Sequence, residues 1–129
     1  MKLGTKEQVL LAVYMEYQKD LPKMAQINNT DLNMDIDVFH TALEKLENEG
    51  MICGVRRMAA DNNRFYCLVL DRMMITREGI GFVEEKFGIQ KEATARDKLT
   101  YLIKKCGVEG WQALKLIGVT ALSRIGDII

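Results

Sequence analysis

The sequence predicts a mainly α-helical fold with a small β-hairpin: a winged helix-turn-helix with a C-terminal extension of two helices. Apolar residues recur with helical spacing up to residue 49 and again after residue 76. Between them, residues 51–70 contain two short apolar runs rich in strand-forming residues. The order helix, short helix, helix, strand, strand, helix is that of a winged helix, with helix 36–49 in the recognition position and hairpin 51–70 as the wing.

The size and composition of the chain fit one globular unit. It has 129 residues, of which 48% are hydrophobic and 28% charged. Because no repeat or flexible linker interrupts it, we expect a winged-helix domain over residues 1–88 and a helical extension over residues 89–129 that is not an independent domain. Basic and acidic residues are equal in number, 18 of each, which argues against a polybasic binder but not against a local basic patch.

The first helix has signals for its start and its end. Thr5 and Gln8 form a capping-box pattern, in which each side chain can satisfy one free amide of the first turn. Pro22 lacks an amide hydrogen and disfavours helical geometry in the residue before it, so the helix should end at about residues 19–21. A single apolar stripe should face the core and consist of Leu10, Val13, Tyr14 and Tyr17.

The next two segments complete the predicted helix-turn-helix. Residues 23–33 are short and polar, and we expect one or two helical turns there, anchored by Met24, Ile27 and Leu32. Asp35 is a suitable N-cap for a helix that runs to about Glu49 and stops at Gly50. The core stripe of this helix should consist of Phe39, Ala42, Leu43 and Leu46.

The predicted hairpin pairs the run 51–55 with the run 65–70, and a turn lies at residues 61–63. Both faces of the second run are apolar, whereas apolar and polar residues should alternate in a hairpin that has one solvent-exposed face. We therefore expect the C-terminal helices or a second subunit to cover the other face. Cys53 and Cys67 should pack on the hairpin as small hydrophobic residues.

Three further helices are expected after the hairpin. The first is capped by Thr76 and ends at Phe87, before Gly88, with its inner face formed by Ile80, Val83 and Phe87. The other two cover residues 90–105 and 109–126, and the last is apolar around much of its circumference.

Several of these segments resemble the YjcQ-like family of small phage-associated winged-helix proteins. The similarity covers roughly residues 5–87, and the segments that carry it are Leu32–Asp35 leading to Phe39, Ala42–Gly50, Ile52–Val55 and Ile75–Gly79. The resemblance implies a winged-helix fold and a prophage origin, and it brings no catalytic residues with it. The segment after Gly88 departs from the minimal pattern.

We find no pattern typical of an enzyme, a cofactor site or a metal site. His40 is the single histidine, and the cysteines are scattered without metal-ligand spacing. The run from Asp31 to Asp37 imitates the start of a calcium loop, but the required glycine and glutamate are replaced by Ile36 and Ala42. We expect no catalytic residues, no cofactor and no small-molecule substrate. No segment reads as a signal peptide or membrane span, so we expect a cytoplasmic location.

Two functions remain open. One is a DNA-binding protein, such as a prophage-type transcriptional regulator that contacts double-stranded DNA; the other is a winged-helix-derived protein–protein interaction module without DNA binding. Helix 35–49 carries five acidic residues against one lysine, which favours the second. The frequency with which small winged helices bind DNA favours the first. The residues available for nucleic acid are Arg56, Arg57, Asn62, Asn63, Arg64, His40 and Thr41.

The last segment also suggests self-association. Residues 107–129 contain more apolar side chains than one amphipathic face can use, and a wet remainder would form an unusually large apolar patch. We therefore expect a homodimer through this segment; the alternative is that the helix completes the core of a monomer. The candidate interface residues are Trp111, Leu114, Leu116, Ile117, Val119, Leu122 and Ile125.

Overall fold

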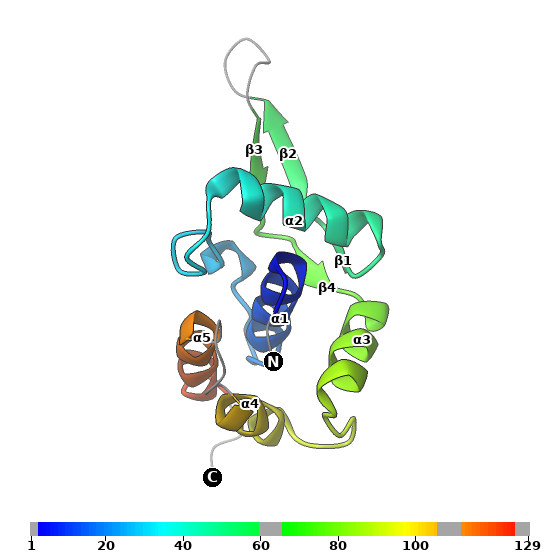
Figure 1. The fold of residues 1–129 in the computed structure, drawn as a ribbon, viewed down its shortest axis with the longest axis vertical. Coiled ribbons are helices and arrows are strands. Elements are labelled where there is room, and N and C mark those ends of the chain that lie inside the picture. Colours follow the sequence, from blue (N-terminus) through cyan, green and yellow to red (C-terminus); the bar gives the residue numbers. More distant parts are fainter. Residues whose placement is uncertain (1–2, 60–65, 106–111, 126–129) are drawn as a thin grey trace.

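The computed structural model describes residues 3–59, 66–105 and 112–125. It is mostly helical with a small antiparallel β part, which confirms the predicted fold class. Figure 1 shows helix α1 at the centre, with the other helices around it and a hairpin that projects from one end. The helices are α1 (Thr5–Tyr17), η1 (Met24–Gln26, a 3-10 turn), α2 (Ile36–Asn48), α3 (Arg77–Phe87), α4 (Ala95–Lys105) and α5 (Gln112–Leu122).

Helix α1 is buried on almost every side. All residues from Val9 to Glu16 are buried, because α2, α3 and α5 all pack against this helix. Leu10, Val13 and Tyr14 are buried as predicted, but Tyr17 is exposed, and the buried residues are not confined to one stripe. A helix that is buried all round does not need an amphipathic pattern.

The start of α1 also differs from the prediction by one residue. Gly4, rather than Thr5, is the N-cap, and its amide donates a hydrogen bond to the Glu7 carboxylate at 2.8 Å. Thr5 is the first helical residue and does not cap, while the side-chain amide of Gln8 donates to the Leu3 carbonyl at 3.3 Å. The helix ends at Tyr17, ahead of the predicted end.

The predicted start, stop and core stripe of α2 are confirmed. The Asp35 side chain accepts a hydrogen bond from the Asp37 amide at 2.8 Å, as an N-cap should. Gly50 follows the helix with a φ of +78°, a conformation that glycine adopts without steric cost. The buried residues of α2 are Phe39, Ala42, Leu43 and Leu46.

The β part consists of two small ladders instead of the single predicted pairing. Strand β1 (Ile52–Cys53) pairs with β4 (Met74–Ile75), and β2 (Arg56–Ala59) pairs with β3 (Tyr66–Val69). The predicted strand 51–55 thus does not pair with 65–70. Gly54 separates β1 from β2 with a φ of +81°, and a Cβ there would lie 2.1 Å from the Arg72 carbonyl oxygen. This glycine lets the chain bend between the two ladders.

The hairpin formed by β2 and β3 is largely open to solvent. Every residue of β2 is exposed, and so is Cys67 on β3. Helices α4 and α5 lie at the other end of the molecule and do not cover it (Figure 1). The expected cover by the C-terminal helices was therefore wrong for the described residues, as was the expectation that Cys53 and Cys67 pack as small hydrophobic residues, since both are exposed.

The predicted cap and end of α3 are confirmed. The Thr76 hydroxyl accepts a hydrogen bond from the Gly79 amide at 3.0 Å, and Gly88 ends the helix in the left-handed region. Val83 and Phe87 are buried, and Ile80 packs against the core in a partly buried position.

The two C-terminal helices share the core with α1. Helix α5 contacts both α1 and α4, and the buried residues of this part are Leu99, Leu102, Leu114, Ala121 and Ile125. Helix α4 begins at Ala95, five residues later than predicted. The division into residues 1–88 and 89–129 stays a prediction. Among the described residues, no helix has the length and apolar character needed to cross a membrane.

A buried polar network connects three helices in this core. Lys98 of α4 donates to Glu84 Oε2 of α3 at 2.7 Å, and the Tyr14 hydroxyl of α1 donates to the same oxygen at 2.9 Å. Burial raises the pKa of Tyr14 well above its ordinary value, and the neighbouring Glu84 carboxylate adds to this increase. The network therefore holds α1, α3 and α4 together through one carboxylate.

Candidate interaction face

The exposed side of α2 and the hairpin β2–β3, which are joined by ion pairs, are together called the α2–hairpin face here. Its α2 part exposes Ile36, Asp37, Val38, Thr41 and Lys45. The N-terminal turn of α2, which would meet base edges in a recognition helix, thus presents an aspartate and two branched apolar residues.

Ion pairs connect the two parts of this face. Arg57 of β2 lies between two carboxylates of α2, with its Nε 3.2 Å from Glu44 Oε2 and its Nη2 3.5 Å from Glu47 Oε1. Glu47 also accepts a hydrogen bond from the Val55 amide at 3.3 Å. These contacts hold the base of the hairpin against α2.

The second described arginine of the hairpin is also paired. Arg56 Nη2 donates to both carboxylate oxygens of Asp71, at 2.9 and 3.1 Å. The Arg56 guanidinium accordingly lowers the pKa of Asp71. Asp71 lies just beyond β3, so the hairpin carries an acidic partner for this arginine within its own stem.

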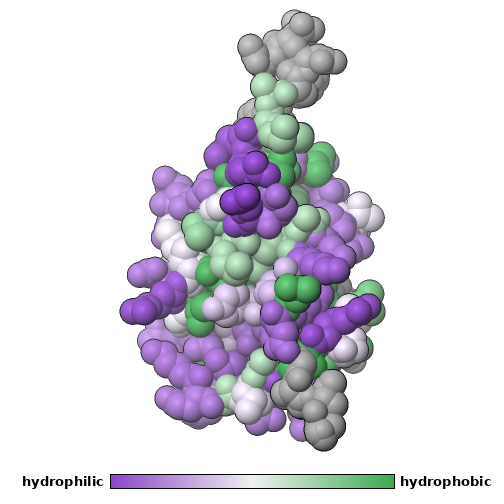
Figure 2. Space-filling view, turned by 180° about the vertical axis from the view of Figure 1, so that it is seen from behind, coloured by the Kyte–Doolittle hydropathy of each residue, from purple (hydrophilic) through white to green (hydrophobic). Residues whose placement is uncertain are grey.

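Apolar side chains lie beside these charges. Met58 and Cys67 face each other across the β2–β3 ladder, and both are exposed. Figure 2 shows hydrophobic surface on the hairpin stem directly below the grey tip, with a hydrophilic cluster beneath it. The face is therefore mixed, with exposed apolar groups next to paired charges.

The structure brings some of the predicted nucleic-acid residues together. Arg56 and Arg57 lie on β2, and Thr41 is exposed on the neighbouring α2. His40 is half-buried, with its ring centroid 6.0 Å from that of Phe39. Asn62, Asn63 and Arg64 lie outside the described residues. The sequence reasoning missed the acidic partners of the arginines; the outward spacing of Glu44 and Glu47, three residues apart on one helix, is the signal that would have suggested them.

The candidate dimer residues fall into three groups. Leu114 and Ile125 are buried in the chain's own core, while Ile117 and Leu122 are partly buried against it. Leu116 and Val119 are exposed on α5. Trp111 lies outside the described residues.

Within the described part of the chain, no three histidine, cysteine or acidic side chains come together in a way that would hold a metal ion. The α2–hairpin face consists of charged and apolar side chains.

The chain is therefore a mostly helical protein with a small antiparallel β part and a projecting hairpin. A family model described as "YjcQ protein" matches residues 8–100. Because this match covers more than half of the chain, the chain belongs to the YjcQ family, as the resemblance indicated. The match also extends through the first half of α4, beyond the span 5–87 suggested by the sequence motifs. Searches of curated proteins and of solved structures found no match.

Proposed function

We propose that this chain is a non-enzymatic winged-helix protein that binds a protein partner through the α2–hairpin face and does not use this face for duplex DNA. The winged-helix interpretation rests on the order α1, η1, α2, hairpin, α3 and on the hairpin that projects beside α2. The observation that carries the functional proposal is that both described hairpin arginines are neutralised by the chain's own carboxylates.

Electrostatics argue against DNA at this face. A protein gains affinity for DNA mainly by placing Lys and Arg against phosphates, and each neutralised phosphate releases a counterion. Here Arg57 is shared between Glu44 and Glu47, so a phosphate brought to this arginine would also approach two carboxylates. Asp37 adds a further negative charge at the exposed start of α2. Among its described residues, the face therefore lacks the excess of positive charge that would attract a duplex.

The apolar part of the face favours a protein partner. Protein interfaces combine an apolar centre with a polar rim, and exposed Met is typical of such surfaces. Val38 on α2 and Met58 on the hairpin are exposed, and Val38 lines a pocket together with Lys6, Asp37 and Lys45. A partner with apolar side chains at its centre and basic groups at its rim would fit this pattern.

Affinity capture tests this proposal with two matched charge insertions. The full chain is used as bait in its native cells, and Val38→Glu and Met58→Glu are compared with Phe82→Glu on α3. Val38 and Phe82 are similarly exposed, at 44% and 40%, so the control removes an equivalent apolar surface elsewhere. We expect one partner that the first two variants lose and the control retains. Equal retention by all three variants would contradict the proposal.

A prophage-type DNA-binding regulator is the second candidate, and one observation favours it. The pairs of Arg56 and Arg57 lie at the surface, where solvent screens ion pairs and leaves them weak, so a phosphate can compete for either arginine. Fluorescence anisotropy with a random duplex at low and moderate salt separates the two functions. We expect no binding under our proposal. Salt-sensitive binding that Arg57→Ala weakens and Lys91→Ala does not would establish the second function instead.

A further inference from the structure

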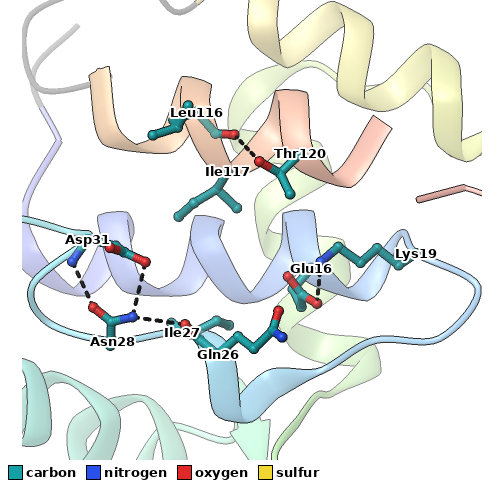
Figure 3. A pocket seen from close by; sticks show the side chains of 9 residues that line it. All are labelled: Glu16, Lys19, Gln26, Ile27, Asn28, Asp31, Leu116, Ile117 and Thr120. Atoms are coloured by element: carbon teal, nitrogen blue, oxygen red, sulfur yellow. Dashed lines mark hydrogen bonds and ion pairs between the residues drawn. The ribbon is translucent and has the colours of Figure 1, made fainter. Parts of the chain in front are cut away.

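A groove runs along the outer side of α5, away from the hairpin. Its first part is a cavity of about 210 Å³ between α5 and the segment that follows α1, seen in Figure 3. A second cavity of about 230 Å³ adjoins it and shares the lining residues Lys19, Gln26 and Thr120. On α5 the two cavities extend from Leu116 to Thr120, and the second continues past the end of the helix to Arg124.

Exposed apolar residues lie on and beside this groove. Leu116, which lines the first cavity, is 68% exposed, and Val119, three residues further along α5, is 49% exposed. Their spacing places both on one face of the helix. Leu21, which lines the second cavity, is also strongly exposed. These apolar side chains are candidates for burial against another surface.

At the floor of the groove, the side chains of Glu16 and Lys19 are buried and form an ion pair with each other at 2.8 Å. These two charges therefore compensate each other within the chain. The two ends are different. Asp31 lies at the end marked by Leu116, where its carboxylate accepts a hydrogen bond from Asn28 at 3.0 Å (Figure 3). Lys23 and Arg124 lie at the other end. Among the described residues, none of these three end residues forms an ion pair.

We propose that a second copy of this chain occupies the groove, with the two α5 helices antiparallel about a two-fold axis near Val119. A two-fold axis makes the interface self-complementary, so each contact occurs twice. The antiparallel arrangement places Asp31 of each copy opposite Lys23 and Arg124 of the other, and it buries Leu116 and Val119 of both. A parallel arrangement would instead oppose like charges at each end. This dimer does not depend on the function of the α2–hairpin face.

Sedimentation equilibrium and light scattering test the assembly. The wild-type chain should reach twice its mass of 14.7 kDa at micromolar concentration. Val119→Glu should raise the dissociation constant at least tenfold, because each dimer would bury two unpaired carboxylates at its centre. Phe82→Glu, on α3, should leave the dimer unchanged. A wild-type chain that stays at 14.7 kDa on concentration to 100 µM, or a Val119→Glu variant that dimerises like the wild type, would overturn the proposal.

Charge exchange tests the antiparallel orientation. Asp31→Arg and Arg124→Asp should each raise the dissociation constant about tenfold, since each substitution places like charges opposite each other twice in the dimer. The double variant should recover wild-type affinity. A mixture of the two single variants should form heterodimers, because each end then has opposite charges again. Failure of both the double variant and the mixture to recover affinity would refute the antiparallel arrangement.

Discussion

Replacement of Lys98 by methionine should destabilise this chain strongly. The Lys98 ammonium is the cation that faces the Glu84 carboxylate, at 2.7 Å, and their side chains are 14% and 4% exposed. Methionine keeps much of the aliphatic length of lysine but removes the charge. Lys98→Met therefore leaves a buried carboxylate with the Tyr14 hydroxyl as its remaining described side-chain partner.

The expected cost follows from this geometry. Removal of one partner from a buried ion pair typically costs 3–5 kcal/mol, because the other charge stays desolvated and uncompensated. Two features place this pair at the lower end of that range: the lysine end reaches some solvent, and the Tyr14 hydroxyl still donates to the carboxylate. We expect the free energy of unfolding to fall by about 3 kcal/mol.

Urea unfolding at pH 7, followed by far-UV circular dichroism, measures this loss. Lys104→Met is the matched control, since Lys104 lies on the same helix, is exposed, and should change the free energy of unfolding by less than about 0.5 kcal/mol. The double variant Glu84→Leu, Lys98→Met should be more stable than Lys98→Met alone, because it removes the stranded carboxylate. A loss below about 1 kcal/mol for Lys98→Met would refute this account of the network.

The remaining predictions are also measured by unfolding. Gly79→Ala should lower the free energy of unfolding by about 3 kcal/mol or more, since the new Cβ would lie 2.2 Å from a backbone carbonyl oxygen. Gly81→Ala on the same helix meets no atom within 4 Å and should raise the free energy of unfolding by up to about 1 kcal/mol. Asp35→Ala removes the N-cap of α2 and should lower the free energy of unfolding by about 1 kcal/mol. Thr5→Ala removes no cap and should change the free energy of unfolding by less than about 0.5 kcal/mol. Equal losses for the two variants would contradict the cap assignment. Above about pH 10 an unfolded tyrosine ionises while folded Tyr14 keeps its proton, so the unfolded state binds fewer protons and stability falls as the pH rises. Tyr14→Phe should therefore lose less stability than the wild type between pH 9 and 11, and parallel pH profiles would disprove the assignment.

Local signals predicted the helices whose ends depend on their own residues. The Asp35 cap, the Gly50 stop and the stripe of α2 were read directly, because capping and amphipathic burial involve residues within one helix. The same holds for α3, between Thr76 and Gly88. The first helix was different: Thr5 satisfied the local capping pattern, but the preceding glycine took the role.

The sequence predicted charged residues of the candidate site but not the ion pairs that join them. The sequence indicates Arg56 and Arg57 as the cations of the predicted wing, and it indicates the acidic character of α2 separately. The pairing of Arg57 with Glu44 and Glu47 depends on the orientation of the hairpin relative to α2. Packing between separate elements sets this orientation. The same is true of Asp71, which meets Arg56 only after β2 and β3 have paired.

The sequence by itself determined the order of the helices and the balance of charge, because these depend on short-range periodicity and on composition. Its motifs carried the resemblance to the YjcQ family. The tertiary structure decided which helix is central, which strands pair and which charges cancel. Helix α1 is surrounded because α2, α3 and α5 each bury apolar side chains against it. A helix in this central position is buried on all sides. Long-range contacts of this kind leave no periodic signal along the chain, so only the folded arrangement shows them.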